Sequence, residues 1–370
     1  MSVSINIPDL LRLASIPGIG AYRIRSLITH FSSAKEVLQA SPRNLVRVEG
    51  IDKKLASFIA HYKDGESFVE EQLSRLNKVN GRIITLWDED YPPLLKKIYD
   101  PPVILFVRGM IKKDDQYSVA IVGTRNPTQY GKLAAEKFAK ELSTKGVCII
   151  SGLARGVDTI AHTAALQSGG RTVSVIGSSL DHIYPAENKK LVDQIEEQDR
   201  GAVVSEFFMD TKPDPGNFPR RNRIISGMSF GTLIIESDLN GGAMITATTA
   251  IDQNRELFCL PGNISEKKSS GTNKLIKLGE AKLVQTVDDI LDELEISLRP
   301  ILTPRKQKNS PPALTIFEQK IFDVLSEEPM HIDLISEQSG LLPSDTLVNL
   351  LSIEFKSLVR QLPGKFFVKI

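Results

Sequence analysis

Between residues 118 and 294, short and strongly apolar segments alternate with longer segments in which apolar residues recur at helical spacing. The longer segments include YGKLAAEKFAKELSTKG and DTIAHTAALQSG. Buried strands that alternate with helices are typical of a parallel sheet covered on both faces. The pattern predicts an α/β fold with a Rossmann-like parallel-sheet domain, to which we assign residues 81–298. Its expected strands are SVAIVG, VCIISG, TVSVIG, AVVSEF, TLIIES, LFCLPG and AKLVQ.

The first 80 residues have a helical pattern and contain a weak repeat. PGIG at residues 17–20 and EGID at residues 49–52 each precede an amphipathic stretch. This arrangement predicts a helical domain of the helix-hairpin-helix or SAM-like kind, in which a glycine turn allows amides at a helix start to face a phosphate. Asp52 replaces the last glycine in the second copy. Contact with DNA and a role in packing or protein contact therefore both stay open for this domain.

The C-terminal part of the chain has a third pattern. Residues 299–313 combine proline with basic and polar residues and are predicted to form a linker. Residues 314–370 contain three helical stretches and a short terminal hairpin, which is the order of a winged-helix domain. The third helical stretch carries Asp345 and Glu354 but, of basic residues, only Lys356. We therefore favour a protein-contact or regulatory role for this domain over reading of a DNA groove.

Composition limits where the chain can work and what it can bind. Lys and Arg number 46 against 45 Asp and Glu, so any site for an anion must be local. The two cysteines, Cys148 and Cys259, lie inside apolar segments and are expected to be core thiols in a reducing compartment. The chain lacks a basic start followed by a long apolar stretch, and no window approaches a membrane span. We expect a cytoplasmic protein without membrane contact.

Several chemistries lack their usual motifs. The first predicted strand is followed by residues 123–127 with the next glycine at Gly131, so the GxGxxG spacing of dinucleotide sites is absent, as is GxxxxGK[ST]. Asp158 and His162 share a helix face, but no GxSxG-like nucleophile accompanies them, and hydrogen bonding to each other or to a neighbouring loop is the expected role. No histidine has the spacing of a zinc motif. We expect no catalytic residue, metal or cofactor.

Glycine loops and arginines predict an anion site instead. In such folds, ligands lie beyond the carboxyl ends of the strands, where the loops that begin at Gly123, Gly152 and Gly177 would meet. Backbone amides of these loops, together with Arg125 and Arg155, would face the anion. The segment NFPRRNRIISG adds Phe218, a ring on which a base can stack, and the phosphate-binding groups of Arg220, Arg221 and Arg223. We expect at least one of these arginines to pair inward with Glu206 or Glu236.

These residues belong to a longer series of motifs, among them VAIVGTRNPTQYG, SGLARGVDTIAH, VIGSSLDHIYPAEN, FPRRNRIISGMS, GGAMITATTA and LPGNISEKKSSGTNKLI. The series resembles the DNA processing protein A family, also called DprA or Smf, over about residues 80–295. The resemblance implies a non-enzymatic protein that binds and protects single-stranded DNA during natural transformation and helps to load the RecA recombinase. It also implies a homodimer formed through the Rossmann-like domain.

The family's DNA-binding positions fall on Arg125, Phe218 and the run Arg221-Asn222-Arg223. The chain departs from the family pattern at Thr124, where serine is usual, at residues 241–244, where two hydroxyls are lost, and at Pro215, where some relatives have lysine. The predicted nucleic-acid site comprises Gly123, Thr124, Arg125, Gly152, Arg155, Gly177, Phe218, Arg221, Asn222 and Arg223.

Two other functions stay open. SGMSFGTLIIE retains Gly231, Thr232 and Glu236 of a stretch typical of related nucleotide-hydrolysing Rossmann variants, but it lacks their leading Pro-Gly-Gly. The chain would then act on a nucleoside monophosphate. Alternatively, the helical and winged domains recruit partners and the chain is an adaptor.

Overall fold

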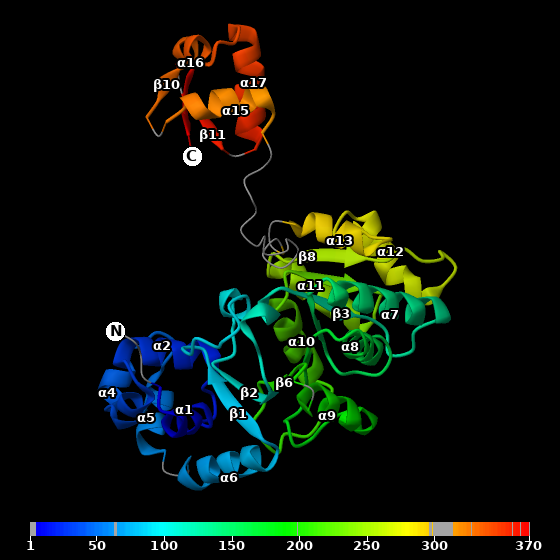
Figure 1. Cartoon of the computed structure of the whole chain (residues 1–370). Coiled ribbons are helices and arrows are strands. Elements are labelled where there is room, and N and C mark those ends of the chain that lie inside the picture. The colour runs from blue at the N-terminus through cyan, green and yellow to red at the C-terminus, as the bar shows by residue number, and fades with distance from the viewer. Residues whose placement is uncertain are drawn as a thin grey trace. The chain divides into compact units, whose positions relative to one another are not determined.

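The structure, a computed structural model, consists of two compact units, Met1–Thr303 and Pro304–Ile370, which are described separately (Figure 1). The residues that it describes are 5–62, 65–197, 199–295, 298, 314–326, 328–356, 358–362 and 364–369. The predicted linker, residues 299–313, lies outside the described residues.

The first unit begins with a group of helices built around two hairpin turns. The helices are α1 (Ile7–Ala14), α2 (Ala21–Phe31), α3 (Ala34–Gln39), α4 (Pro42–Leu45), α5 (Lys53–His61) and α6 (Gly65–Lys78). Gly18 and Gly50 occupy the turns with φ of 86° and 81°, a backbone region that favours glycine. The guanidinium of Arg23 donates to the carbonyl oxygens of both glycines and so ties the turns together.

A sheet of nine strands forms the body of this unit, in the order β1-β2-β6-β5-β4-β3-β7-β8-β9. Adjacent strands from β6 to β9 run parallel, as the sequence predicts, whereas β1 and β2 add an antiparallel edge that the sequence analysis did not anticipate. The strands are β1 (Gly81–Thr85), β2 (Ile104–Gly109), β3 (Ser118–Val122), β4 (Cys148–Ser151), β5 (Thr172–Val175), β6 (Gly201–Ser205), β7 (Gly231–Ile234), β8 (Glu256–Cys259) and β9 (Lys282–Leu283).

Helices cover both faces of the sheet (Figure 1). Alternate strand residues point to opposite faces, so Ile121 packs with α7, α8 and α13, whereas Ala120 and Val122 pack with α10 and α11. The apolar core on the second face continues into the N-terminal helices. Both cysteines are buried free thiols, as predicted. The remaining helices of this unit are α7 (Gln129–Thr144), α8 (Val157–Gln167), α9 (Lys189–Glu197), α10 (Asn217–Gly227), α11 (Gly242–Asp252), α12 (Ser270–Lys277) and α13 (Val287–Glu293).

The second unit is a winged-helix domain, as the sequence predicts. Ile321, Ile335, Leu350 and Phe367 form its buried core. Its three helices are α15 (Ile316–Val324), α16 (Ile332–Ser339) and α17 (Pro343–Phe355), and its small sheet has the order β10 (Met330–His331), β12 (Phe366–Lys369), β11 (Val359–Leu362). No helix among the described residues of either unit is both long and apolar enough to cross a membrane.

Candidate functional site

A cleft of about 420 Å³ opens at the carboxyl end of β3, between the loops that follow the parallel strands and the helices α10 and α11. Because β3, β4 and β5 are adjacent and parallel, the loops that follow them share this edge of the sheet, which confirms the predicted position of the loops. The residues that line the cleft are Val122, Arg125, Ala154, Asp158, Tyr184, Pro213, Pro215, Phe218, Pro219, Arg221, Asn222, Ile225, Gly242, Ala243, Ile245 and Thr246.

Arg125 and Phe218 form the open side of this cleft. Arg125 is exposed, Phe218 is half-buried, and the guanidinium carbon lies 5.4 Å from the centre of the ring. Within the described part of the chain, the Arg125 guanidinium has no carboxylate partner and forms no hydrogen bond. Its charge is therefore available to a ligand that also meets the aromatic face.

Gly177 holds the Phe218 ring in place. A Cβ atom on this glycine would lie 2.8 Å from Cδ1 of Phe218, closer than carbon atoms approach one another. The ring therefore packs directly against the backbone after β5. In this structure Gly177 contributes by leaving room for Phe218.

Arg221 is not placed where the sequence analysis expects it. Its side chain is only 4% exposed and donates hydrogen bonds to the carbonyl oxygens of Gly152 and Val175 and, over 3.2 Å, to Oδ1 of Asn222. Burial lowers the pKa of Arg221 to about 10. The structure corrects the prediction for this residue, because a guanidinium already engaged by buried carbonyls is not free to bind a phosphate.

The amide of Gly152 is also engaged inside the protein. It donates to Oδ2 of Asp158 over 3.1 Å, and the amide of Ala154 donates to the same atom over 3.3 Å. Burial raises the pKa of Asp158 to about 6, against the opposing charge of Arg221. The expectation that the Gly152 amide faces a bound anion is therefore wrong here, because an internal carboxylate already accepts it.

His162 does not form a pair with Asp158. Its Nδ1 lies 2.6 Å from Oγ1 of Thr172, which itself donates to the carbonyl oxygen of Ile149 over 2.7 Å. Since the threonine hydrogen is used, Nδ1 of His162 carries the proton and Nε2 is left without one. Nε2 is buried without a partner in the described structure. The imidazole is therefore a core group and not a general base.

This burial predicts an acid-sensitive contribution of His162 to stability. Burial lowers the pKa of His162 to about 3, below the usual value of 6.5. The unfolded chain takes up the proton first as the pH falls, so stability is complete above pH 6.5 and is lost towards pH 3, by up to about 1.4 kcal/mol per pH unit. We expect the melting temperature of His162→Gln to fall less steeply than that of the parent between pH 6.5 and 4. Parallel slopes would contradict this.

Arg223 and Glu206 form an ion pair, with Nη2 of the arginine donating to the carboxylate. This confirms that at least one arginine of the run pairs inward. Arg223 does not line the cleft. Arg220 lies on the surface with its guanidinium carbon 5.4 Å from the centre of the Phe207 ring. The three arginines of this run, Arg220, Arg221 and Arg223, thus have three different environments.

Glu236 is used to begin a helix. It accepts a hydrogen bond of 2.8 Å from the amide of Thr128 and a second from the hydroxyl of Thr128, the residue that caps α7. A Cβ on Gly131 would collide with this carboxylate at 2.3 Å. Among the described residues, none of Arg220, Arg221 and Arg223 pairs with Glu236, which was one of two options considered from the sequence.

A small hollow beside the main cleft brings four predicted residues together: Arg125, Gly152, Arg155 and Phe218. Arg155 forms two hydrogen bonds with the carboxylate of Glu187, of 2.7 and 2.8 Å.

Tyr184 also lines the hollow and is not among the site residues predicted from the sequence. Its ring lies 5.9 Å from the Phe218 ring and 5.9 Å from the guanidinium carbon of Arg155. The sequence did offer a signal for Tyr184, because it is an aromatic residue in IYPAEN, shortly after the third glycine loop.

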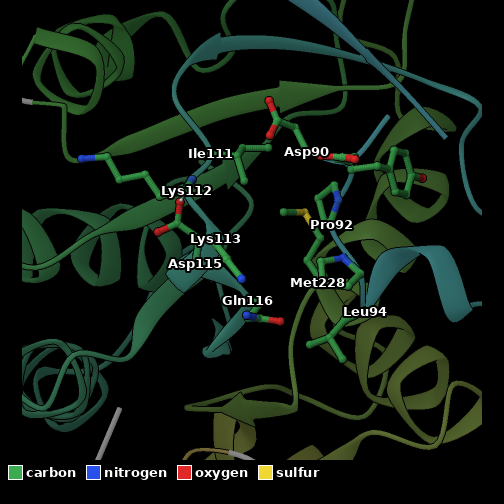
Figure 2. A pocket seen from close by; sticks show the side chains of 12 residues that line it. Asp90, Pro92, Leu94, Ile111, Lys112, Lys113, Asp115, Gln116 and Met228 are labelled. Carbon is green, nitrogen blue, oxygen red and sulfur yellow. Dashed lines mark hydrogen bonds between the residues drawn. The ribbon is translucent and has the colours of Figure 1, made fainter. Parts of the chain in front are cut away.

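A second cleft, of about 450 Å³, contains none of the predicted residues (Figure 2). Leu94 and Met228 contribute apolar surface to it, and Lys112 and Asp115 lie on its other side (Figure 2). Lys112 is paired with Asp199 at 2.5 Å, and Asp115 is paired with Arg171 at 2.6 Å. These two charges are already paired, and the predicted residues gather elsewhere, so we place the candidate site at the cleft beside Phe218.

The domains and the cleft define a class: a Rossmann-like protein, preceded in sequence by a helix-hairpin-helix domain and followed by a winged-helix domain, in which an arginine with no ion-pair partner among the described residues lies beside an aromatic ring. Residues 82–295 match the family described as DNA recombination-mediator protein A. Residues 305–365 match the DprA winged helix domain, and residues 10–59 match the SAM-like helix-hairpin-helix tandem. The chain belongs to the DNA processing protein A family, also called DprA or Smf.

Individual relatives agree with this assignment. The chain is 37% identical over 302 residues to Protein Smf of Escherichia coli, with 80% of each chain covered. It is 36% identical over 264 residues to DNA processing protein DprA of Bacillus subtilis, covering 71% of this chain and 86% of the relative.

Two solved structures are similar to the fold. DNA processing protein A of Streptococcus pneumoniae aligns with a TM-score of 0.67 and 31% identity over 78% of this chain and 99% of that one. DNA processing protein A of Helicobacter pylori aligns with a TM-score of 0.53 and 34% identity over 59% of this chain and 96% of that one, and its structure concerns a single-stranded DNA binding mode.

Proposed function

We propose that the cleft binds single-stranded DNA without requiring a particular sequence. The observation that carries the proposal is the unpaired guanidinium of Arg125, 5.4 Å from the Phe218 ring. A guanidinium binds phosphate and an aromatic ring stacks with any base, and together they suit an unpaired strand. The similar protein from Helicobacter pylori, for which a single-stranded DNA binding mode is described, supports the same assignment.

The predicted site residues then divide by role. Arg125 meets the phosphates, and Phe218 stacks with a base. The Gly123 loop positions Arg125, since the amide of Thr124 donates to the carbonyl oxygen of Glu236 over 2.8 Å. Arg221, Gly152 and Gly177 support the site from inside the protein: Arg221 bonds to the Gly152 carbonyl oxygen, and Gly177 leaves room for the Phe218 ring. Asn222 lines the cleft, and Arg155 and Arg223 contribute positive charge that Glu187 and Glu206 partly neutralise.

We extend the proposal to a recombination mediator that binds DNA without catalysis, loads the RecA recombinase and acts as a homodimer. The description of the matching family as a recombination-mediator protein supports the mediator role. At the cleft, Asp158 is hydrogen-bonded to loop amides, and His162 is buried behind it. Release of free base from a nucleoside monophosphate would contradict a function without catalysis.

Arg125→Ala tests the proposal through salt dependence. Removal of one phosphate contact should weaken binding to every single-stranded sequence alike and reduce the slope of log K against log salt by about 0.7. The measurement is a titration of mixed-sequence single strands at several salt concentrations. Lys190→Ala, which removes an exposed charge on α9, is the matched control and should leave the slope unchanged. An unchanged slope in folded Arg125→Ala would contradict the assignment.

A further inference from the structure

The helix α17 of the winged-helix domain is apolar on two sides. Leu350 and Ile353 are fully buried in the core of the domain, where α15 and α16 pack against α17 (Figure 1). Leu347, Val348 and Leu351 form a second stripe, and 40%, 66% and 40% of their surface is exposed. A surface helix normally has one apolar stripe, which faces its own core. A second, exposed stripe is typical of a surface that binds a partner.

Carboxylates border the exposed stripe of α17 on both sides. Asp345 lies three positions before Val348, and Glu354 lies three positions after Leu351, so the two acids flank the stripe on opposite edges. Asp345 is exposed, and the half-buried Glu354 accepts a hydrogen bond of 2.8 Å from the amide of Gln361. The apolar stripe therefore lies within a negatively charged surface.

Nucleic acid matches this surface poorly. In helix-turn-helix proteins, the helices in the places of α16 and α17 are those that meet DNA. Here IDLISEQS and PSDTLVNLLSIEF contain no basic residue, and their four carboxylates would repel phosphates. The basic residues next to these helices are engaged within the domain, since Lys356 donates to Glu318 over 2.6 Å and His331 lies 3.4 Å from Asp333. The four carboxylates are those of Asp333, Glu337, Asp345 and Glu354.

A second copy of the same stripe matches it poorly as well. Two such stripes packed together would bring the acidic edges of both helices into one interface, and like charges across an interface cost free energy. The complementary surface is apolar at its centre and positively charged at its edges.

We propose that the stripe formed by Leu347, Val348 and Leu351 docks an amphipathic helix of another protein, one whose own apolar stripe is bordered by lysine or arginine. Packing of the apolar side chains supplies affinity. Ion pairs with Asp345 and Glu354 select the partner and its orientation, as flanking charges do in coiled coils. This inference goes beyond the proposed function, because the winged-helix domain would hold a protein partner independently of DNA at the cleft.

Two synthetic peptides of about 18 residues, long enough to form a helix alone, test the proposal. Both carry leucines at helical spacing along one side. Lysines border the leucines in the first peptide, and glutamates border them in the second. Fluorescence anisotropy measures the binding of each peptide to the full chain at physiological salt. The leucine–lysine peptide should bind at least about tenfold more tightly than the leucine–glutamate peptide.

Substitutions on α17 show where the peptide binds. The double variant Val348→Gln with Leu351→Gln keeps side chains that suit a helix but removes the apolar stripe, and should weaken binding of the leucine–lysine peptide at least about tenfold. Asp345→Lys should weaken that binding about threefold and strengthen binding of the leucine–glutamate peptide by a similar factor. Leu133→Gln, which replaces a leucine of α7 that is 57% exposed, is the matched control and should leave both affinities unchanged.

Three results would overturn the proposal. The leucine–lysine peptide could fail to bind the parent, or could bind the folded double variant as tightly as the parent. The double variant could lose affinity for single-stranded or duplex DNA, which would make the stripe a nucleic-acid surface. Sedimentation could show that the double variant has lost an oligomer that the parent forms, in which case a second copy covers the stripe.

Circular dichroism and thermal melting of each variant verify that it is folded. We expect the double variant to bind single-stranded DNA with parental affinity, since the cleft is unchanged. Failure of peptide binding with intact DNA binding would remove this inference alone, and loss of DNA binding in Arg125→Ala bears on the proposed function alone.

Discussion

Replacing Arg221 by leucine is expected to lower the free energy of unfolding by about 3–5 kcal/mol, the effect of removing one member of a buried charged pair. The guanidinium is buried and donates hydrogen bonds to the carbonyl oxygens of Gly152 and Val175. Its positive charge also stabilises the negative charge of buried Asp158. Leucine fills part of the space, but it can neither donate hydrogen bonds to the two carbonyl oxygens nor balance the charge of Asp158. Chemical denaturation near neutral pH measures the change.

The adjacent arginine provides the control. Arg220 is exposed, its guanidinium carbon lies 5.4 Å from the centre of the Phe207 ring, and its charge acts on Glu206 without the short ion pair that Arg223 forms, so Arg220→Leu should change the free energy of unfolding by no more than about 0.5 kcal/mol. Similar free energies of unfolding for the two variants would show that the buried hydrogen bonds of Arg221 do not stabilise the fold.

Replacing Phe218 by alanine is expected to weaken binding of single-stranded DNA by about 1–3 kcal/mol, the range for loss of one stacked base, which corresponds to about 5- to 150-fold. The ring carries no charge, so the slope of log K against log salt should stay at the parental value. This distinguishes Phe218→Ala from Arg125→Ala, which changes the slope. Binding titrations at two or more salt concentrations measure both quantities.

An exposed aromatic residue away from the cleft provides the control for this experiment. Tyr99 is 94% exposed, and Tyr99→Ala removes a ring of similar size. Its affinity for single strands should equal that of the parent. Loss of affinity in Tyr99→Ala with parental affinity in Phe218→Ala would move the binding surface away from the cleft.

The parallel part of the fold could be predicted because its strands are short, continuous apolar runs that alternate with helical segments, and glycine loops follow β3, β4 and β5. The antiparallel edge was missed. Its strands, GRIIT and ILFVRG, lie beside a helical pattern and a proline-rich segment, and no alternation of helices and strands marks them. Only the pairing of β2 with β6 shows that they extend the sheet.

The site could be predicted as a region but not residue by residue. Arg220, Arg221 and Arg223 look alike in sequence, yet their directions differ because successive helix positions are rotated about the axis. One signal was available: Arg221 lies three and four residues before the buried Ile224 and Ile225, which places it on the packed face of α10. The hydrogen bond between Asp158 and the Gly152 amide joins the start of α8 to the loop before it, and sequence spacing gives no measure of that distance.

The nucleotide-processing alternative was based on the glycine loops and on Gly231, Thr232 and Glu236, and the structure shows the Glu236 carboxylate at the start of α7. Its two oxygens accept hydrogen bonds from Thr128. In many Rossmann-like folds this end of the first helix faces a phosphate. Here an internal carboxylate occupies the space, which favours a ligand held at the Phe218 side of the loops.

The most direct test of the central claim is a single-stranded DNA titration, across salt concentrations, of a folded variant that combines Arg125→Ala with Phe218→Ala. We expect the affinity to fall at least as far as in either single variant and the salt slope to decrease. Parental affinity together with a parental slope would contradict this expectation, because DNA would then be held by a surface that includes neither residue.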